Sequence, residues 1–549
     1  MARVERRVAV FGGGIGGLTV AHELAERGFQ VSVYERRPGF GGKARSHTGK
    51  GCEGSPGLPG EHGHRIFPGF YLHTDDTMKR IPFGDNPNGV LDNLAQVSDA
   101  ILAQEDWPRL VRQTKFKRWP SAWSLWRDSG LTLFELLFYA ARLLRILTAC
   151  QERQISQYES LSWSDFLGSA KRSARFQKIF LRSWSQTYAS LPEDRASTRT
   201  MGNIAVLMSE MFTPRRLCGI RVLNGPTSAK WIRPWIRHLE SLGVDFHPES
   251  PLVGLQLAGG TLTGALVRQG AETVEVSADD YVCAMPVERM KNLVTSELAE
   301  AAPSLARLSR LETAVMGGFQ LYLRQDLPMT HGHYLYADSA WALTSISQRQ
   351  FWPDAPSPSA AQAAPGGIIS VSIGDWSRPG KFTTNKSAGE CTARELRDEI
   401  VAQIEHSLPP PQAQAFIQAD VYDYQMEPGL EDLAERRQHE EPLMLNTVSS
   451  WQNRPEASTE IPNLFLAADY VRTHMDLATM EAANEAGRRA ANAIMDAASV
   501  DAVRCQIWPP WDPWFLRILR SLDRQFFRSG KSEVDVMGAG RPVAAGENQ

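Results

Sequence analysis

The sequence contains little that would mark a secreted, metal-binding or nucleic-acid-binding protein. Only six of its 549 residues are cysteine. They lie far apart, without a CxxC pair or a Cys/His cluster, so we expect neither a disulfide framework nor a bound metal. The formal net charge of −3 gives no electrostatic basis for binding nucleic acid. The first residues, MARVERR, lead directly into an apolar strand and lack the apolar segment of a secretory signal, so we expect a cytoplasmic protein.

The chain also shows no internal repeat. Hydrophobic residues make up 42% of it and charged residues 22%, a composition typical of a soluble globular protein with a large core. Because 549 residues exceed the length of an ordinary domain, the sequence predicts two domains.

What the sequence does have is a cluster of glycines close to its N-terminus. The segment VAVFGGGIGGLTVAHELAERGFQVSVYE is typical of a strand, a turn, a helix and a second strand. In its G-x-G-x-x-G turn, Gly12 allows a tight bend, Gly14 the close approach of a pyrophosphate, and Gly17 the packing of helix on strand. Glu35 ends the second strand, where its carboxylate can accept hydrogen bonds from ribose hydroxyls and disfavours a 2′-phosphate. We therefore predict a dinucleotide whose phosphates lie at the helix N-terminus, around Gly12, Gly14, Ile15, Gly16 and Gly17.

A second pair of glycines narrows the choice of dinucleotide. The run RRPGFGGKARS places Gly41-Gly42, Lys43 and Arg45 shortly after Glu35. This resembles the E-x(n)-G-G-[RK]-x-x-[ST] element of the FAD-dependent amine oxidase and phytoene desaturase superfamily. The resemblance implies that FAD is the cofactor and that basic residues and backbone line its pyrophosphate. The residues concerned are Arg36, Gly42, Lys43 and Arg45. Most members have arginine where this chain has Lys43, which keeps the charge but lacks the bidentate fork.

A downstream segment extends the resemblance. The residues IPNLFLAADYVRTHMDLATMEAANEAGRRAANAI are typical of a strand that ends at Asp469, followed by a helix with small residues on one face. They are similar to the G-D…S-M-E-G-A element that closes over the flavin in the superfamily, with Ala468 and Ala482 in place of two glycines. The resemblance implies that Asp469 holds the ribityl–phosphate region. It also implies that Thr479 and Met480 present a helix N-terminus to the flavin, where the helix dipole stabilises the reduced form.

The matching segments occur in order along the chain, and a third one supplies, by the same resemblance, a backbone contact to adenine near Val253. We therefore predict an α/β protein with a Rossmann-type FAD-binding domain of the glutathione-reductase-like kind and a discontinuous substrate domain of mixed sheet and helices. The predicted FAD-binding domain comprises 1–75, 223–294 and 456–500, and the substrate domain 76–222 and 295–455. Residues 501–530 form an amphipathic segment in this prediction, and 531–549 a disordered tail.

Titratable residues crowd the segment GLPGEHGHRIFPGFYLH, which follows the first FAD element. The superfamily has a D-x-G loop beside the isoalloxazine at this place. The run also resembles a bacterial subgroup labelled phytoene desaturase-like or hydroxysqualene dehydroxylase-like. Near the reaction we expect Glu61, His62, His64 and Arg65, with Tyr470 as an aromatic wall of the substrate site. For the histidines two interpretations stay open: acid–base or orienting groups near the flavin, or structural hydrogen bonding of the loop.

Two apolar segments bear on substrate and location. Residues 131–149 are apolar almost all round but carry three charges, which makes them a poor transmembrane helix. They form either a buried core helix or the wall of a lipid tunnel or membrane entry. Residues 508–528 place Trp508, Trp511 and Trp514 around the start of a helix with apolar residues on one face and arginines on the other. This helix either makes peripheral contact with a membrane or packs on its own domain with its arginines in water.

The resemblance implies an FAD-dependent oxidoreductase. We interpret it as an enzyme that moves a hydride from a C–H bond of a lipophilic, isoprenoid- or polyene-like substrate to flavin N5, as a desaturase does. Three alternatives stay open: a flavin amine oxidase, a polyene isomerase without net electron transfer, and a non-enzymatic lipid-binding protein of the same fold. No second G-x-G-x-x-G in context indicates an NAD(P)H site, so we expect electrons to pass to oxygen or to a quinone.

Overall fold

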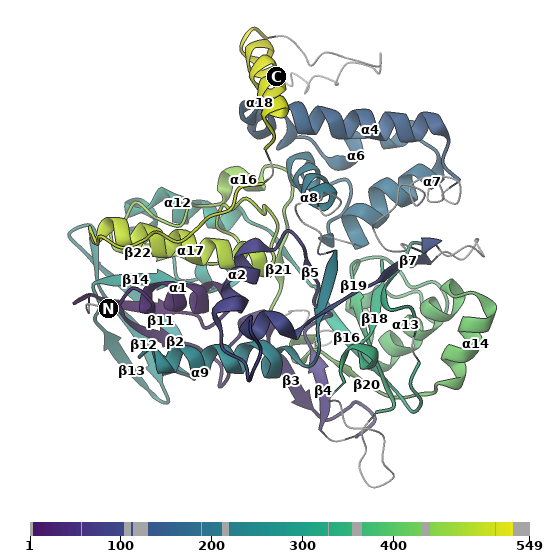
Figure 1. Cartoon of the computed structure of the whole chain (residues 1–549), viewed down its shortest axis with the longest axis horizontal. Coiled ribbons are helices and arrows are strands. Elements are labelled where there is room, and N and C mark those ends of the chain that lie inside the picture. Colours follow the sequence, from purple (N-terminus) through teal and green to yellow (C-terminus); the bar gives the residue numbers. More distant parts are fainter. Residues whose placement is uncertain are drawn as a thin grey trace.

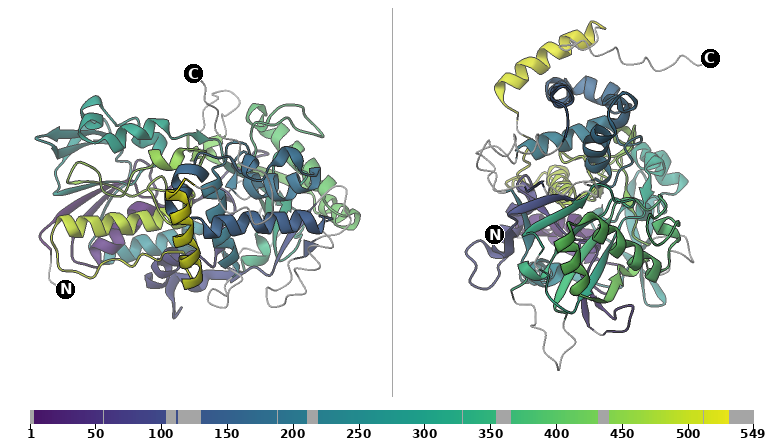
Figure 2. Two further views of the ribbon diagram at one scale, coloured as in Figure 1. Left: turned by 90° about the horizontal axis from the view of Figure 1, so that it is seen from above. Right: turned by 90° about the vertical axis from the view of Figure 1, so that its right-hand side faces the viewer.

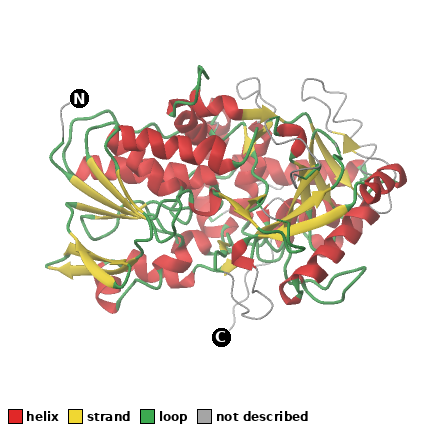
Figure 3. Cartoon of the chain, turned by 90° about the horizontal axis from the view of Figure 1, so that it is seen from below, coloured by secondary structure: helices red, strands yellow, loops and turns green. Residues whose placement is uncertain are grey.

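The computed structural model describes residues 4–55, 57–103, 111–112, 130–187, 189–210, 219–327, 329–353, 365–430, 440–510 and 512–530. Cys218, Trp511 and the predicted disordered tail lie outside the described residues. Figure 3 shows the two largest sheets on opposite sides of the molecule, and in Figure 1 a layer of helices stands above them.

Short apolar runs from distant parts of the chain form a five-stranded parallel sheet with the order β10-β2-β1-β14-β22. Its strands are β1 (Arg7–Phe11), β2 (Gln30–Tyr34), β10 (Asp245–His247), β14 (Asp280–Cys283) and β22 (Leu464–Leu466). β14 and β22 are buried throughout, and β1 is buried after its first residue, as expected for a parallel sheet covered on both faces. Because parallel strands end at one edge, the loops that follow β1, β2, β14 and β22 meet there.

Helices α1 (Ile15–Ala25), α9 (Arg233–Ser241) and α17 (Met480–Ala497) pack together beside this sheet. Glu23 of α1 is almost fully buried and pairs with Arg27 at 2.8 Å, with Arg488 of α17 at 3.4 Å, and with Arg80 of α2 (Leu72–Arg80). Burial alone would raise the pKa of Glu23, but Arg488, Arg80 and Arg27 lower it to about 2. Helices α1, α2 and α17 are thus joined by a buried ionic cluster, and the helices beside the sheet also share apolar contacts.

The second large sheet has seven strands in the order β20-β16-β19-β18-β17-β7-β8. They are β7 (Asp99–Ala103), β8 (Val111–Arg112), β16 (Gly317–Leu323), β17 (Gly332–Tyr336), β18 (Thr344–Ser347), β19 (Gly367–Ile373) and β20 (Val421–Met426). All neighbours are antiparallel except β17 and β7. Helices α13 (Ala393–Ser407) and α14 (Pro410–Gln418) cover one face and share its apolar core.

Smaller sheets join these parts. β11 (Leu252–Ala258), β12 (Thr261–Gln269) and β13 (Glu272–Val276) form an antiparallel sheet, and β3 (Ser46–Gly49) pairs with β4 (Leu58–Glu61). β5 (Phe67–Pro68) and β6 (Leu94–Gln96) flank β9 (Ile220–Leu223), and β15 (Thr313–Ala314) pairs with β21 (Leu443–Met444). The domain boundaries predicted from the sequence remain a proposal.

The layer of helices at the top of Figure 1, here called the helical cap, comprises the described residues 130–210 and has an apolar core of its own. Its longer elements are α4 (Leu133–Thr148), the π-helical segment Gln177–Thr187 and α8 (Thr198–Glu210). Shorter helices are α5 (Gln151–Arg153), α6 (Trp163–Phe166) and α7 (Ala174–Phe176). The C-terminal helix α18 (Trp514–Arg528) lies on the outside of this cap.

Helix α4 differs from the buried core helix that was one of the two predicted alternatives. Only Glu135, Phe138 and Ile146 of this helix are buried, because it lies on the surface of the cap and packs by one side on α8 and α18. No helix among the described residues is long and apolar enough to cross a membrane.

Candidate active site

A cavity of about 850 Å³ opens at the edge of the parallel sheet where its strands end. Gly12, Glu35, Ala284 and Ala467, which directly follow β1, β2, β14 and β22, all line it. Ligands of open α/β sheets bind at this edge, and the volume is near the upper end of the range of about 300–1,000 Å³ for small-molecule sites. The predicted cofactor residues that line it are Gly12, Gly14, Ile15, Gly16, Glu35, Arg36, Gly42, Lys43, Val253, Asp469, Thr479 and Met480.

The glycine turn shows which of its residues the fold requires and which it does not. Gly12 has a φ of +115°, and a side chain at Gly17 would overlap the carbonyl oxygen of Gly12, so packing explains both glycines. Gly14 has ordinary extended dihedrals of −80° and −175°, and a Cβ there would meet only the Cα of Gly42, at 3.7 Å. Since Gly14 lines the cavity, its lack of a side chain leaves room for a ligand against the backbone. This fits a dinucleotide phosphate.

Glu35 holds the turn and faces the same cavity. One of its carboxylate oxygens accepts a hydrogen bond from the backbone N–H of Gly13 at 2.8 Å, and the other accepts one from Arg37 N–H at 3.0 Å. Each oxygen retains a lone pair, so the side chain can also accept from ribose hydroxyls.

The basic residues at this end of the cavity meet carboxylates that the sequence pattern does not indicate. Glu441, which is buried, accepts hydrogen bonds from both terminal nitrogens of Arg45, and Arg37 lies 2.7 Å from it. Lys43 donates to Glu288 at 2.9 Å and also contacts the carbonyl of Pro442. Although burial opposes ionisation, Arg45 and Arg37 keep the pKa of Glu441 below its ordinary value. The positive charge that the sequence predicts around the phosphates is therefore partly neutralised by the protein itself.

The N-terminus of α17 is fixed at the cavity by its own cap and by α2. Thr479 is the N-cap and accepts from the backbone N–H of Ala482 at 3.1 Å. Glu481 in the first turn accepts from the backbone N–H groups of His73 and Thr74, both at 2.9 Å, and from the His73 ring at 2.7 Å. The positive end of the α17 dipole is thereby held at a lining position, next to Thr479 and Met480.

Beyond the cofactor end, many of the lining side chains are apolar. Its lining side chains from the helical cap, the seven-stranded sheet and the loop before α17 include Ile204, Met208, Met316, Ile373, Met475 and Leu477. The carboxylates among the described lining residues are Glu35, Glu288, Asp469 and Glu441. The first three follow strands of the parallel sheet, and Glu441 is bound to its arginines, so the cap side of the described lining carries no negative charge.

Comparisons with known proteins identify the family. The model of the family described as flavin containing amine oxidoreductase matches residues 15–495. The chain belongs to this family. It is therefore an FAD-dependent oxidoreductase, and the predicted resemblance, fold class, enzyme class and cofactor are confirmed.

Relatives by sequence are remote. The chain is 23% identical over 508 residues to the carotenoid phi-ring synthase of Streptomyces griseus, covering 89% of this chain and 87% of that protein. It is 23% identical over 330 residues to the 15-cis-phytoene desaturase of Synechococcus elongatus, covering 58% of this chain and 66% of that protein.

Solved structures share the fold. Cyclohexylamine oxidase from Brevibacterium oxydans IH-35A has a TM-score of 0.62 at 13% identity, over 90% of this chain and 100% of that one. Putrescine oxidase bound to putrescine has a TM-score of 0.61 at 13% identity, with the same coverage of both chains.

Four of the predicted residues do not line the described cavity: Gly17, Arg45, Glu61 and Tyr470. For Glu61 the reason is its hydrogen bonding. Its buried carboxylate accepts from the Ser46 hydroxyl at 2.5 Å, from the backbone and hydroxyl of Thr227, both at 2.9 Å, and from Arg65 at 3.0 Å. The side chain ties the β3–β4 hairpin to the chain before α9. These contacts favour an anchoring role for Glu61, and its predicted place beside the reacting atoms stays a prediction.

Tyr470 likewise does not line the cavity. It is fully buried, and burial raises the pKa of its hydroxyl well above the ordinary value. That hydroxyl has no hydrogen-bond partner among the described residues. The aromatic side chain that does line the cavity near the α17 N-terminus is Tyr71, whose hydroxyl lies within hydrogen-bonding reach of Thr479. Tyr71 belongs to the histidine-rich run, but its spacing gives no signal that separates it from its neighbours.

His62, His64 and Arg65 do line the cavity. Burial, and then the charge of Arg65, lower the pKa of His64 to about 4, so its ring is neutral at pH 7. Its Nδ1 lies 3.2 Å from the Ser372 hydroxyl. A neutral ring with so low a pKa is no proton donor and a weak base at neutral pH, which favours the orienting or structural interpretation for His64.

His62 pairs with the buried Glu427, and these two with Glu441 bring three potential metal ligands together. Glu441 already pairs with Arg37 and Arg45. The positive charge of these two arginines opposes the binding of a metal cation at this group.

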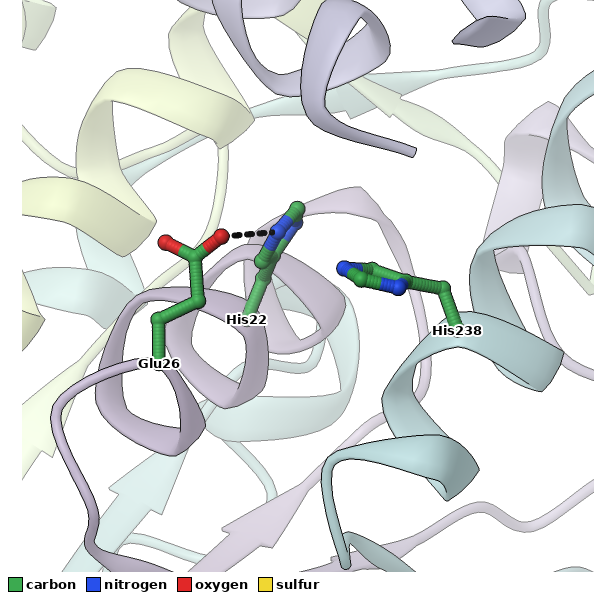
Figure 4. Close-up of side chains that lie close together, drawn as sticks. All are labelled: His22, Glu26 and His238. Atoms are coloured by element: carbon green, nitrogen blue, oxygen red, sulfur yellow. Dashed lines mark hydrogen bonds and ion pairs between the residues drawn. The ribbon is translucent and has the colours of Figure 1, made fainter. Parts of the chain in front are cut away.

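A second group with potential ligand atoms, His22, Glu26 and His238, lies between α1 and α9 (Figure 4). Trp235 Nε1–H donates to His22 Nδ1 at 3.1 Å. The proton of a neutral His22 ring is therefore on Nε2, which lies 3.1 Å from Glu26 and donates to it. Both ring nitrogens are thus engaged, and the contact joins the two helices instead of offering a metal ligand.

Proposed function

We propose that the protein oxidises a lipophilic, isoprenoid- or polyene-like substrate by removing a hydride from a C–H bond, as a desaturase-type dehydrogenase. The observation that carries the proposal is that one cavity is lined both by the glycine and basic residues at the sheet edge and by apolar side chains of the helical cap. The names of the remote relatives, a carotenoid phi-ring synthase and a phytoene desaturase, support a substrate of this class.

In this proposal, separate groups of lining residues bind the cofactor and the substrate. The turn around Gly14 and the N-terminus of α1 hold the pyrophosphate of FAD, and Glu35 holds the ribose. Arg36, Lys43, Val253 and Asp469 line the rest of the cofactor, as the family resemblance implies. When bound, FAD supplies a two-electron hydride acceptor. The N-terminus of α17, at Thr479 and Met480, favours negative charge that develops next to it.

The apolar lining orients the hydrocarbon chain of the substrate. Loss of a hydride from one carbon is balanced by loss of a proton from its neighbour, which gives the new double bond. No described lining residue is assigned as the base, so in this proposal the proton passes to water. The electrons leave to oxygen or to a quinone.

The same lining distinguishes this proposal from an amine oxidase. A protonated amine is stabilised by a carboxylate, and the cap side of the described lining holds none. An uncharged hydrocarbon meets apolar side chains such as Ile204, Met208 and Met316 there and needs no carboxylate, so this part of the cavity favours it.

Incubation of the purified holoenzyme in air with separate isoprenoid, polyene and amine fractions tests the proposal. The expected product of a lipid fraction is lighter than the substrate by two hydrogen atoms, as measured by mass spectrometry. A product with a changed retention time but an unchanged mass, formed only when the flavin is first reduced, would show an isomerase. Turnover of amines alone would contradict the proposal. Reoxidation rates with oxygen and with a soluble quinone identify the acceptor.

A further inference from the structure

The C-terminal helix α18 is attached to the protein by its polar side. Asp523 accepts hydrogen bonds from Arg153 at 3.0 Å and from the backbone N–H of Cys150 at 2.8 Å. Arg520 donates to the carbonyl of Leu147 at 2.9 Å. These contacts place the charged face of α18 on the ends of α4 and α5.

The apolar face of α18 consequently points away from the protein. Trp514, Phe515, Ile518, Leu519 and Leu522 are between 41% and 72% exposed, whereas Leu516 is the only buried residue of the helix. Positions 515, 518, 519 and 522 form one stripe at helical spacing. One predicted alternative places α18 on its own domain with its arginines in water. The helix does pack on α4 and α5, but by its polar side, and its apolar stripe stays exposed.

Helix α4 adds a second exposed apolar stripe at the same end of the molecule. Leu133, Phe134, Leu137 and Leu144 are between 49% and 69% exposed. Figures 1 and 2 show α18 above α4 as the outermost helix of the cap. Two neighbouring helices thus present large aliphatic and aromatic side chains to solvent, which for a monomer marks an interaction surface.

The positive charges beside this surface indicate which kind of partner it binds. The side chains of Arg517 and Arg528 are 69% and 71% exposed, and α18 carries four arginines and one aspartate. An exposed apolar stripe with a tryptophan and flanking arginines suits the boundary of an anionic bilayer. A second copy of this chain would bring the same arginines face to face, so charge disfavours self-association.

We propose that α4 and α18 together form a docking surface for anionic lipid bilayers, and that the substrate enters through the helical cap beneath it. The second part rests on the proposed function. Helix α8 connects the two places: Gly202 packs closely against Ile146 of α4, and Ile204 and Met208 of α8 line the cavity. In this proposal a lipophilic molecule that leaves the bilayer at this surface passes along α8 to the apolar end of the cavity.

Co-sedimentation of the full-length holoenzyme with vesicles tests the docking surface. The vesicles contain phosphatidylcholine alone, or phosphatidylcholine with phosphatidylglycerol at about one third of the lipid. We expect binding to the anionic vesicles, weakened about tenfold or more by the double substitution Ile518→Asp and Leu522→Asp in the exposed stripe.

The matched control is Ser521→Asp, which adds a charge at an exposed position of the same helix outside the apolar stripe and is compared with Ile518→Asp alone. It retains most of the binding if the apolar stripe inserts. Melting temperatures confirm that both variants fold. Equal loss of binding in both variants, or no binding by the wild type, overturns the proposal, as does a dimer that the stripe variant dissociates without any vesicle binding.

The two proposals fail separately. Vesicle binding without oxidation of any lipid contradicts the proposed function and leaves the docking surface standing. Oxidation of detergent-dispersed lipid without vesicle binding contradicts the docking surface alone.

Discussion

Arg45 donates to both carboxylate oxygens of Glu441, at 3.2 and 3.0 Å, across a separation of 396 residues in the sequence. Arg37 lies 2.7 Å from the same carboxylate. The protein thus places an anion of its own within the basic cluster at the cofactor end of the cavity. Because FAD would bring a second anion to this cluster, the stabilisation that FAD gives should depend on whether Glu441 is present.

Replacement of Glu441 by glutamine should leave Arg37 and Arg45 without their carboxylate. The apoprotein should lose about 1–3 kcal/mol of unfolding free energy, because a buried charge without its partner is costly. Added FAD brings a diphosphate to the same cluster, so it should raise the melting temperature more in the variant than in the wild type. Glu440→Gln, which removes only the longer and exposed contact of Arg37 at 3.9 Å, is the control. Equal stabilisation of both proteins by FAD would show that the diphosphate lies elsewhere.

Gly14 and Gly17 should respond to alanine in different ways. Gly14→Ala adds a methyl group that touches little of the protein, so the fold should persist while the Kd for FAD rises roughly tenfold or more. Gly17→Ala drives its methyl group into the Gly12 carbonyl and should destabilise the protein itself. Thermal melts and flavin fluorescence titrations separate the two effects. A Gly14→Ala variant with normal FAD affinity would argue against a phosphate at this turn.

Substitution of Tyr71 and of Tyr470 tests which of these two aromatic side chains faces the substrate. Tyr470→Phe removes a buried hydroxyl that has no partner among the described residues, so stability should be unchanged or higher and oxidation unaffected. Tyr71→Leu removes an aromatic side chain from the lining and should slow flavin reduction by substrate, measured by stopped-flow absorbance. The opposite pattern would restore Tyr470 to the active site.

The depressed pKa of His64 predicts how stability depends on pH. In the unfolded chain the ring binds a proton below about pH 6.5, whereas in the folded protein it does so only below about 4. Between these values the unfolded state holds more protons, so stability should fall as the pH falls from 6.5 towards 4. The difference between the two pKa values sets an upper limit of about 3 kcal/mol on this loss of unfolding free energy.

His64→Gln should remove that contribution. Urea unfolding at pH 7 and pH 4.5 should therefore give a smaller loss of free energy at acid pH for the variant than for the wild type. Identical losses would show that His64 is accessible to water and titrates normally.

The cofactor end could be predicted from the sequence because its geometry is local. Gly12, Gly14, Gly17 and Glu35 lie within 24 consecutive residues, and one strand–turn–helix–strand unit fixes their positions. The positions of residues that depend on distant partners could not be predicted. Glu61 accepts a hydrogen bond from Thr227, 166 residues away, and no spacing rule connects the two.

Helix α18 shows a different limit. Its periodicity predicts which residues share a face, but both faces could meet the protein. The polar face packs on the protein because Asp523 accepts hydrogen bonds from Arg153 and Cys150, and Arg520 donates one to Leu147. These are tertiary contacts, and the periodicity of the helix cannot predict them.

The central claim is tested most directly by an anaerobic titration of the purified yellow holoenzyme with a lipid fraction, followed in the visible spectrum. The account predicts that an isoprenoid or polyene fraction bleaches the oxidised flavin band, with one equivalent of new double bond per flavin, and that amines leave the band unchanged. Bleaching by amines alone, or a protein that shows no flavin band even after FAD is added, would contradict it.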